Sequence, residues 1–297
     1  MALTGRAPLP PGRTQVMGVI NLTPDSFSDG GLHASPESAL RQARRMAREG
    51  ADLIDLGGQS TRPGARLVDT ADELKRLMPA LQAILTDRTR PNPNGPGADA
   101  EPSDRRPWPL ISIDTFRADV AEQALAAGAD WINDVSGGVF DAGMLPLIAA
   151  AGCPYVLMHS RGNSRTMDQL TSYDDVVNDV HRALLKATDR ALAAGVKRQQ
   201  ILWDPGLGFA KNTDHNLALL EGLESIVSEG FPVLVGPSRK RFIGAVLEEP
   251  RPRARLWGTA AVVCRAIAAG ARVVRVHDVA PIVQTARMAE ALWEERP

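Results

Sequence analysis

Acidic and amide side chains recur at the ends of short apolar runs in this sequence, together with one lysine. Asp114, Asn133 and Asp204 stand at or next to the ends of such runs, and Lys240 follows another. Carboxylate and amide oxygens accept hydrogen bonds from N–H groups, whereas an ammonium group donates to a carbonyl oxygen. A flat heterocycle with an amino-imino edge and a ring carbonyl would satisfy all four side chains. We therefore predict a site for a polar, planar ring that is rich in hydrogen-bonding groups.

A second set of side chains, at or after the ends of the same kind of run, consists of cations and neutral donors. Guanidinium groups and neutral N–H or O–H donors are suitable partners for phosphate oxygens. The members of this set are Asn21, Thr61, Arg62, Ser238, Arg275 and His277. A phosphate site beside a ring site indicates a group that is transferred away from pyrophosphate.

The sequence lacks the motifs of several other classes of enzyme. There is no G-x-x-x-x-G-K-[ST] loop, and the Gly206-Leu207-Gly208 segment lacks the third glycine of a dinucleotide-binding fingerprint. The 5 His and 2 Cys form no H-E-x-x-H or cysteine-rich zinc pattern. Because a nucleophile elbow is also absent, neither a hydrolase triad nor a nicotinamide-dependent enzyme is favoured.

The elements that must position these side chains are short buried strands separated by helices. Apolar runs rich in branched residues, as in strands buried on both faces, lie at 15–20, 52–56, 110–113, 131–135, 155–158, 201–203, 233–235 and 273–276. Amphipathic helical stretches lie between them, for example at 37–49, 117–127, 173–194 and 254–269. Six of the strands follow a helix-closing glycine, namely Gly50, Gly128, Gly152, Gly195, Gly230 and Gly270.

Eight strand-then-helix units predict an α/β fold, a single-domain (β/α)8 TIM barrel, with an open doubly wound sheet as the alternative. In such a barrel the catalytic residues gather at the carboxyl ends of the strands. The two sets of polar side chains would then meet on one face. The loop at 160–172 follows the fifth strand and would border the same face.

Length and composition fit one folded domain. The chain has 297 residues, of which 44% are hydrophobic and 23% charged, with 34 Lys and Arg against 35 Asp and Glu. This balance favours neither a disordered chain nor a nucleic-acid partner, since there is no basic excess and aromatic residues make up only 4%. No run has the pattern of a membrane span or a secretory signal. Because the two cysteines show no metal or redox spacing, we expect a cytoplasmic protein.

Proline and glycine mark two segments outside the regular pattern. Residues 1–13 are predicted to form a disordered N-terminal arm, and residues 14–297 the catalytic barrel. Within the barrel, residues 86–109 are rich in Pro, Gly and Asp and are predicted to form a surface loop insertion. That loop enters the third strand, so it would lie on the face opposite the site.

Two long segments resemble the signature segments of a known family. They read MGVINLTPDSFSDGG at 17–31 and DLGGQSTRPG at 55–64. Later blocks agree in order, with SID at 112–114, INDVSGG at 132–138, DPGLGFAK at 204–211, SRKRFIG at 238–244 and RVHDV at 275–279. In these segments the chain resembles the dihydropteroate synthases. The resemblance implies a homodimeric (β/α)8 barrel of folate biosynthesis, which uses Mg2+ to join 6-hydroxymethyl-7,8-dihydropterin pyrophosphate to p-aminobenzoate with release of pyrophosphate.

The resemblance also implies roles for individual residues. The pterin would be held by Asp114, Asn133, Asp204 and Lys240, with Met158 and Phe209 lining its slot. The pyrophosphate would meet Asn21, Arg275 and His277, and Asn21 would also contact Mg2+. Catalysis would depend on Asp114, Lys240, Arg275 and His277. Around p-aminobenzoate, and in the loops that close over it, would lie Phe27, Thr61, Arg62, Pro63, Ser238 and Arg241. Sulfonamides, which mimic p-aminobenzoate, should compete with it.

The chemistry favours departure of pyrophosphate before attack by the amine. An uncharged aryl amine needs no strong base, whereas the leaving pyrophosphate needs its charge offset. We therefore expect an SN1-like transfer, with Asp114 close to the developing cation. Two alternatives stay open, namely the pterin-binding domain of a corrinoid-dependent methyltransferase and a non-catalytic pterin-binding homologue. The blocks at 61–63 and 238–240 favour the synthase over the first, and the retained Lys240, Arg275 and His277 favour it over the second.

Overall fold

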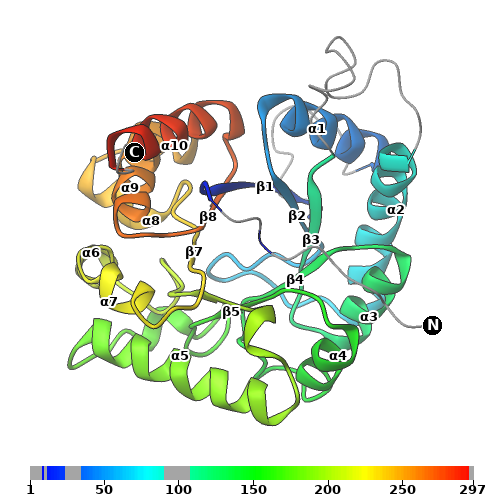
Figure 1. Ribbon diagram of the computed structural model, residues 1–297, viewed down its shortest axis with the longest axis horizontal. Helices are drawn as coiled ribbons and strands as arrows, with labels where there is room; N and C mark the ends of the chain where they lie inside the picture. The colour runs from blue at the N-terminus through cyan, green and yellow to red at the C-terminus, as the bar shows by residue number, and fades with distance from the viewer. Residues whose placement is uncertain (1–8, 10–11, 24–34, 90–107, 294–297) are drawn as a thin grey trace.

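The computed structural model describes residues 9, 12–23, 35–89 and 108–293, and the strands in this part of the chain form one parallel, eight-stranded sheet. The sheet order is β6-β5-β4-β3-β2-β1-β8-β7, and a bridge between Trp203 and Val233 joins its two edges. The sheet therefore closes into the predicted barrel, with the helices outside it (Figure 1). The strands are β1 (Gln15–Asn21), β2 (Leu53–Gly57), β3 (Leu110–Asp114), β4 (Trp131–Asp134), β5 (Tyr155–Met158), β6 (Ile201–Asp204), β7 (Leu234–Val235) and β8 (Val273–Val276).

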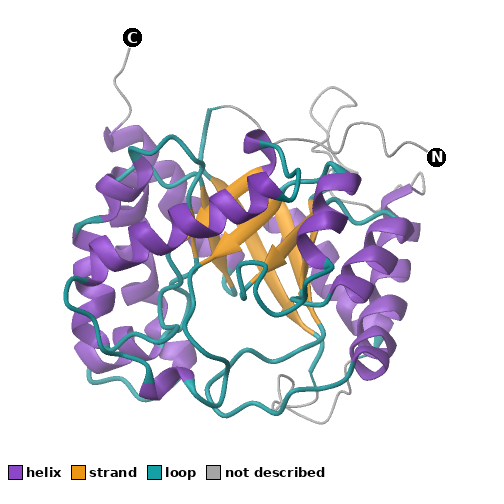
Figure 2. Cartoon of the chain, turned by 90° about the horizontal axis from the view of Figure 1, so that it is seen from below, coloured by secondary structure: helices purple, strands orange, loops and turns teal. Residues whose placement is uncertain are grey.

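Helices occupy the connections between the strands and surround the barrel, as Figure 2 shows from a second direction. They are α1 (Pro36–Glu49), α2 (Thr70–Thr89), α3 (Ala118–Ala127), α4 (Met144–Ala151), α5 (Val176–Ala193), α6 (Thr213–Glu221), α7 (Leu223–Val227), α8 (Arg241–Val246), α9 (Leu256–Ala268) and α10 (Val279–Trp293). The (β/α)8 prediction is confirmed, and the open doubly wound sheet is wrong. None of the described helices combines the length and the apolarity that crossing a membrane requires.

The six predicted helix-closing glycines are confirmed. Gly50 ends α1 with a φ of 97°, a left-handed conformation that lets the chain turn directly toward β2. A positive φ is also found at Gly128, Gly152, Gly195, Gly230 and Gly270.

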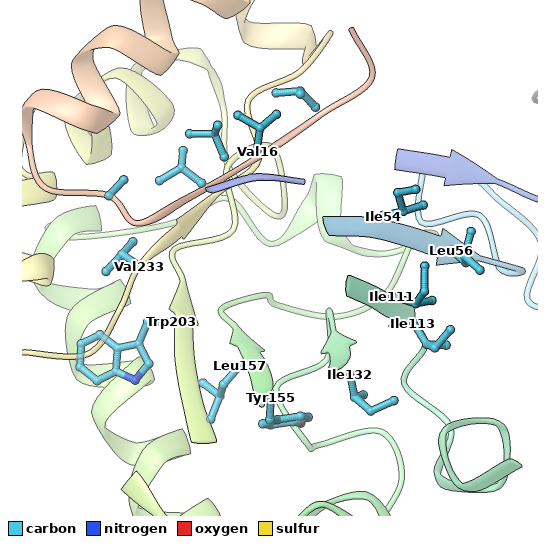
Figure 3. Packing of buried hydrophobic residues seen from close by; sticks show 14 of the residues in the cluster. Val16, Ile54, Leu56, Ile111, Ile113, Ile132, Tyr155, Leu157, Trp203 and Val233 are labelled. Carbon is cyan, nitrogen blue, oxygen red and sulfur yellow. The ribbon is translucent and has the colours of Figure 1, made fainter. Parts of the chain in front are cut away.

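The main core lies between the barrel wall and the helices. Ile54 and Leu56 of β2 and Ile111 and Ile113 of β3 are fully buried and face outward into this layer, as Figure 3 shows at close range. Because successive side chains of a strand point to opposite faces, the residues between them must face the barrel interior. Only the alternate strand residues, which face the barrel interior, can therefore line a site inside the barrel.

The lower interior of the barrel is filled by a separate apolar cluster, here called the floor. It consists of Met17, Leu53, Trp131, Val156, Leu202, Leu234 and Val273, all of them buried. Leu9 and Leu110 pack against this cluster. The floor closes the barrel on one side, so a ligand can enter only from the carboxyl ends of the strands.

The predicted surface loop at 86–109 and the predicted disordered arm at 1–13 both differ from these predictions at the residues that the structure describes. Helix α2 continues to Thr89, because Asp87 in its last turns is buried and pairs with Arg44 of α1, so residues 86–89 are helical rather than loop. Residues 90–107 of that predicted loop lie outside the described residues. In the predicted N-terminal arm, Arg13 pairs with Asp52 and Leu9 packs on the floor, while most of the arm lies outside the described residues.

Candidate active site

The layer of interior side chains directly above the apolar floor is mostly polar. The floor residues Leu53, Trp131, Val156, Leu202 and Val273 are followed two positions later by Asp55, Asn133, Met158, Asp204 and Arg275. Because side chains repeat with a period of two along a strand, these residues face the interior directly above the floor. The strand period thus gathers side chains from five strands into one cup, to which Asp114 of β3 adds a carboxylate.

An ion-paired guanidinium lies across this cup. Arg275 donates from Nε to Oδ2 of Asp55 at 2.7 Å and from Nη2 to Oδ2 of Asp114 at 2.7 Å. Burial raises the pKa of Asp114 to about 7, Arg275 opposes this rise, and the charge of Asp55 adds to it. A carboxyl group with such a pKa is poised between its neutral and charged forms near neutral pH.

Asn133 is tied to the same carboxylate. Its Nδ2 donates to Oδ2 of Asp55 at 3.1 Å, and both side chains are buried. Asp55 was missed as a functional residue by the sequence reasoning, which treated it as part of an apolar strand. The available signal was a charged residue at an interior position of a strand that is otherwise apolar.

Asp204 and Lys240 are oppositely charged groups that influence each other electrostatically in the cup. Burial raises the pKa of Asp204, while a hydrogen bond from the Gly206 N–H at 2.7 Å and the charge of Lys240 oppose the rise. Burial lowers the pKa of Lys240 to about 8. The Lys240 Nζ lies 4.4 Å from the ring centroid of Phe209, a cation–π contact that holds the aromatic ring beside the ammonium group.

A second buried lysine fixes the loop after β6. Lys211 Nζ donates to the carbonyl oxygens of Gly206 and Phe209, both at 3.0 Å, and lies 2.9 Å from Nδ1 of His159. Burial lowers the pKa of Lys211 to about 7, and burial together with Lys211 lowers the pKa of His159 to about 2. His159 is therefore neutral and serves as an acceptor. Neither residue was assigned a role from the sequence, although Lys211 stands in the block at 204–211 and His159 directly follows the predicted strand at 155–158.

His277 is joined to Ser238 on the adjacent strand end. The His277 backbone N–H donates to Ser238 Oγ at 3.2 Å, and Ser238 Oγ lies 3.0 Å from Nδ1 of the ring. We assign the hydroxyl proton to the bond with Nδ1, which leaves the ring proton on Nε2. Burial lowers the pKa of His277 to about 3, with Arg239 and Arg275 adding to the effect. His277 is thus a neutral donor rather than a cation.

Gln59 organises the loop after β2. Its Nε2 donates to the carbonyl oxygens of Ser60 at 2.8 Å and Arg66 at 3.1 Å, and its Oε1 accepts from the N–H of Val68 at 2.8 Å. A buried amide side chain therefore fastens both ends of the loop. The amide nitrogen of Gln59 is thus used as a donor twice.

The loop after β2 is also attached to the loop after β5. The N–H of Gly64 donates to the carbonyl of Ser164 at 2.7 Å, and Ser164 Oγ donates to the carbonyl of Ala65 at 2.9 Å. Thr61 lines the same pocket as Ser164, while Arg62 and Pro63 are exposed on the loop. This apolar pocket runs beneath the two loops and is lined by residues that include Thr61, Phe116, Phe140, Met167 and Phe209. The loop at 160–172 thus borders the site, as expected.

One predicted site residue that the structure describes, Arg241, stands apart from the cup. Arg241 begins α8 and is exposed, and its guanidinium pairs with Asp168, with Nη2 2.6 Å from Oδ1. Asn21 ends β1 beside Gly57 and is only half-buried. Phe27 lies outside the described residues.

The cup and its loops have the form of a pterin-binding enzyme, and comparison with known proteins agrees. The family model described as "Pterin binding enzyme" matches residues 17–91 and 103–277. A curated dihydropteroate synthase from Synechocystis is 47% identical over 95% of this chain and 91% of its own length.

The chain is also similar to solved structures of dihydropteroate synthases. Xanthomonas albilineans dihydropteroate synthase with 4-aminobenzoic acid is 39% identical, covers 96% of this chain and 94% of its own, and has a TM-score of 0.84. The structure of that organism's enzyme in complex with 7,8-dihydropteroate is 36% identical, covers 96% of this chain and 95% of its own, and has a TM-score of 0.80. The chain belongs to the dihydropteroate synthase family.

Proposed function

We propose that this chain joins 6-hydroxymethyl-7,8-dihydropterin pyrophosphate to p-aminobenzoate, giving 7,8-dihydropteroate and pyrophosphate for folate synthesis. The observation that carries the proposal is the cup above the floor, in which Asp114, Asn133 and Asp204 line one interior with Arg275 and Lys240. Acceptors for a ring edge and cations for a pyrophosphate are the two requirements of this substrate.

The pterin is proposed to lie in the cup between the acceptors and Lys240. Asp114, Asn133 and Asp204 would accept from the N–H groups of the ring, and Lys240 would donate to the ring carbonyl. Met158 and Phe209 would contact the faces of the ring, since Met158 is buried at the end of β5 and Phe209 is held against Lys240. Each charge-assisted bond of this kind contributes about 1.5–3 kcal/mol.

The pyrophosphate is proposed to lie at the mouth of the cup, against Asn21, Arg275 and His277. Arg275 is partly exposed there, with 21% of its side chain accessible, and its planar fork suits phosphate oxygens. Nε2–H of the neutral His277 is a further donor. Breaking the bond between the exocyclic carbon and the bridging oxygen leaves the electron pair on pyrophosphate, so these donors would stabilise the leaving group.

Mg2+ is proposed as the metal of the reaction. Among the described residues, no three His, Cys, Asp or Glu side chains are grouped as a metal site. Because Mg2+ usually keeps several waters and takes substrate phosphates as ligands, one protein oxygen from Asn21 fits an ion that arrives with the pyrophosphate. When bound, the ion would supply positive charge to the leaving pyrophosphate.

p-Aminobenzoate is proposed to bind under the loop after β2, where Thr61 and Phe209 line the apolar pocket. Arg62 and Pro63 of that loop, Phe27, and Ser238 and Arg241 after β7 would surround or close over it. The amine nitrogen would attack the exocyclic carbon after pyrophosphate has left and then lose its proton. A charged Asp114 would stabilise the cation that exists between the two steps.

We further propose that the chain forms a homodimer and that it is located in the cytoplasm. Trp257, Met288 and Leu292 are large apolar residues of α9 and α10 that are 76%, 60% and 61% exposed, and a homodimer would cover them. A Trp257→Glu variant should then sediment as a monomer while the parent chain sediments as a dimer. A reducing cytoplasm would keep the free thiols of Cys153 and Cys264 reduced.

Pyrophosphate release tests the proposed reaction. Release should require both the pterin pyrophosphate and p-aminobenzoate, and a sulfonamide should compete with p-aminobenzoate. Pterin binding without release would instead indicate a non-catalytic homologue.

The order of the steps needs a separate measurement. Pterin pyrophosphate labelled in its bridging oxygen should scramble the label on the enzyme in the absence of p-aminobenzoate. Strict dependence of scrambling on p-aminobenzoate would contradict departure before attack.

A further inference from the structure

Asp55 lies in the cup and bonds two of the side chains proposed to bind the substrate, Asn133 and Arg275. Its side chain is fully buried, and a single oxygen, Oδ2, accepts from both Arg275 Nε at 2.7 Å and Asn133 Nδ2 at 3.1 Å. The other oxygen, Oδ1, accepts no hydrogen bond from the described residues. A buried carboxylate is costly unless both oxygens are satisfied, so this arrangement is poorly suited to stability alone.

Asp134, an equally buried aspartate on β4, which β3 separates from β2 in the sheet, provides the contrast. It faces the opposite side of the sheet from Asn133. Its oxygens accept from the N–H groups of Ser136 at 2.7 Å and Gly138 at 2.9 Å and from the Tyr155 hydroxyl at 2.7 Å. Both oxygens are therefore used within the fold, as expected of a carboxylate with a structural role.

The bond to Asp55 fixes the orientation of the Asn133 amide. A carboxylate only accepts, so the NH2 group of Asn133 must point to Asp55, because the flipped amide would place its oxygen against the carboxylate. The carbonyl oxygen of Asn133 is then the atom available to a ligand. Asp55 therefore makes Asn133 an acceptor at this place in the cup.

The same carboxylate holds Arg275 by its Nε. This contact fixes the inner end of the guanidinium, while Nη2 bridges to Asp114. The outer nitrogens are then presented in one plane, which matches the fork geometry that binds phosphate. One buried carboxylate thus sets both a ring-binding amide and a phosphate-binding guanidinium.

We infer that Asp55 is a positioning residue that sets ring specificity, because its hydrogen bond to Asn133 makes the cup select rings that present N–H donors at that edge. The inference rests on the proposed function, which supplies the pterin as the ring. Its chemistry predicts discrimination between a 2-amino ring and its 2-oxo counterpart, in which a carbonyl acceptor replaces the exocyclic amino donor and the adjacent N1 gains a proton.

Calorimetry with two ligands tests this assignment in the full-length chain. The probes are 6-hydroxymethylpterin and 6-hydroxymethyllumazine, its 2-oxo counterpart. The parent chain should prefer the pterin, and Asp55→Asn should reduce that preference by roughly tenfold, since the introduced amide can donate and allows Asn133 to flip. Asp134→Asn is the matched control and should lower the unfolding temperature while leaving the preference unchanged.

A double-mutant cycle separates positioning from a general structural role. If Asp55 acts through Asn133, then Asp55→Asn should not change the preference further once Asn133→Ala is in place. An unchanged preference in Asp55→Asn, or an equal loss in Asp134→Asn, would overturn the inference.

Two further outcomes are decisive. Asp55→Ser replaces the carboxylate by a hydroxyl group that can also donate, and it should lose the preference as well. If both Asp55 variants fail to fold, Asp55 serves the fold and the assignment is wrong. Failure of the parent chain to bind the pterin at all would instead refute the proposed function.

Discussion

Arg275 and Asp114 are in direct contact at the mouth of the barrel, with Nη2 of the guanidinium 2.7 Å from Oδ2 of the carboxylate. The two residues come from β8 and β3, which are separated in the sheet by β2 and β1. The same guanidinium is the proposed partner of the pyrophosphate. The pyrophosphate and Asp114 would therefore share one cation. The charge of Asp114 would then depend on whether pyrophosphate is bound.

Replacing Arg275 should move the pH dependence of the chemical step. Burial raises the pKa of Asp114 to about 7, and Arg275 holds it below the value that burial alone would give. If the charged carboxylate stabilises the cation, the single-turnover rate should rise with pH around 7 in the parent chain. In Arg275→Gln the midpoint should move to higher pH, because the carboxylate loses its cation.

The matched control for this experiment is Arg265→Gln. Arg265 makes an exposed ion pair with Glu224, away from the cup. Its replacement should leave the midpoint where it is. An unchanged midpoint in Arg275→Gln would show that Asp114 does not govern the rate.

Lys240 should limit pterin affinity at alkaline pH. Burial, with Arg275 adding to it, lowers the pKa of Lys240 to about 8, so the ammonium loses its charge as the pH rises through that value. Pterin affinity measured by calorimetry should fall across this range. In Lys240→Arg the fall should disappear, because a guanidinium stays protonated. The same alkaline fall in both proteins would assign it to another group.

Gln59→Leu should loosen the loop after β2. The change leaves the carbonyls of Ser60 and Arg66 and the N–H of Val68 without the amide that bonds them. Loss of a buried partner costs about 1–3 kcal/mol, which urea unfolding would detect. The KM for p-aminobenzoate should rise more than the KM for the pterin substrate. Gln82→Leu, at an exposed position of α2, is the control, and an equal KM change there would contradict the assignment.

His159 should make the protein sensitive to acid. Burial, with Lys211 adding to it, lowers the pKa of His159 from 6.5 to about 2, so the unfolded chain binds a proton below pH 6.5 that the folded chain does not. The stability due to neutral His159 is complete above pH 6.5 and is lost as the pH falls toward 2. The loss amounts to at most about 1.4 kcal/mol per pH unit.

His159→Asn removes this titration while retaining an acceptor for Lys211. Unfolding by urea at a series of pH values should show a shallower decline of stability below pH 6.5 in the variant than in the parent chain. Identical slopes would show that His159 is not the group responsible.

The barrel and the face that carries its site can both be predicted from the order of residues along the chain. Short apolar runs and the glycines before them define where the strands begin, as at Gly50 before β2. Polar residues such as Asp114 and Asp204 at the strand ends were bound to share one face, because all the strands of a parallel barrel end on the same side. Both statements depend only on local order along the chain, and a single sequence records that order directly.

The pairing of side chains, by contrast, could not be predicted from the order of residues and is seen in the folded barrel. Arg275 meets Asp55 across 220 residues of sequence, and nothing local to either residue specifies the contact. Arg241, placed near p-aminobenzoate from the sequence, instead pairs with Asp168 in the loop after β5. His277 is neutral because its surroundings are buried and positively charged. Pairing and protonation depend on distances between strands and on exclusion of water, and these exist only once the barrel has closed.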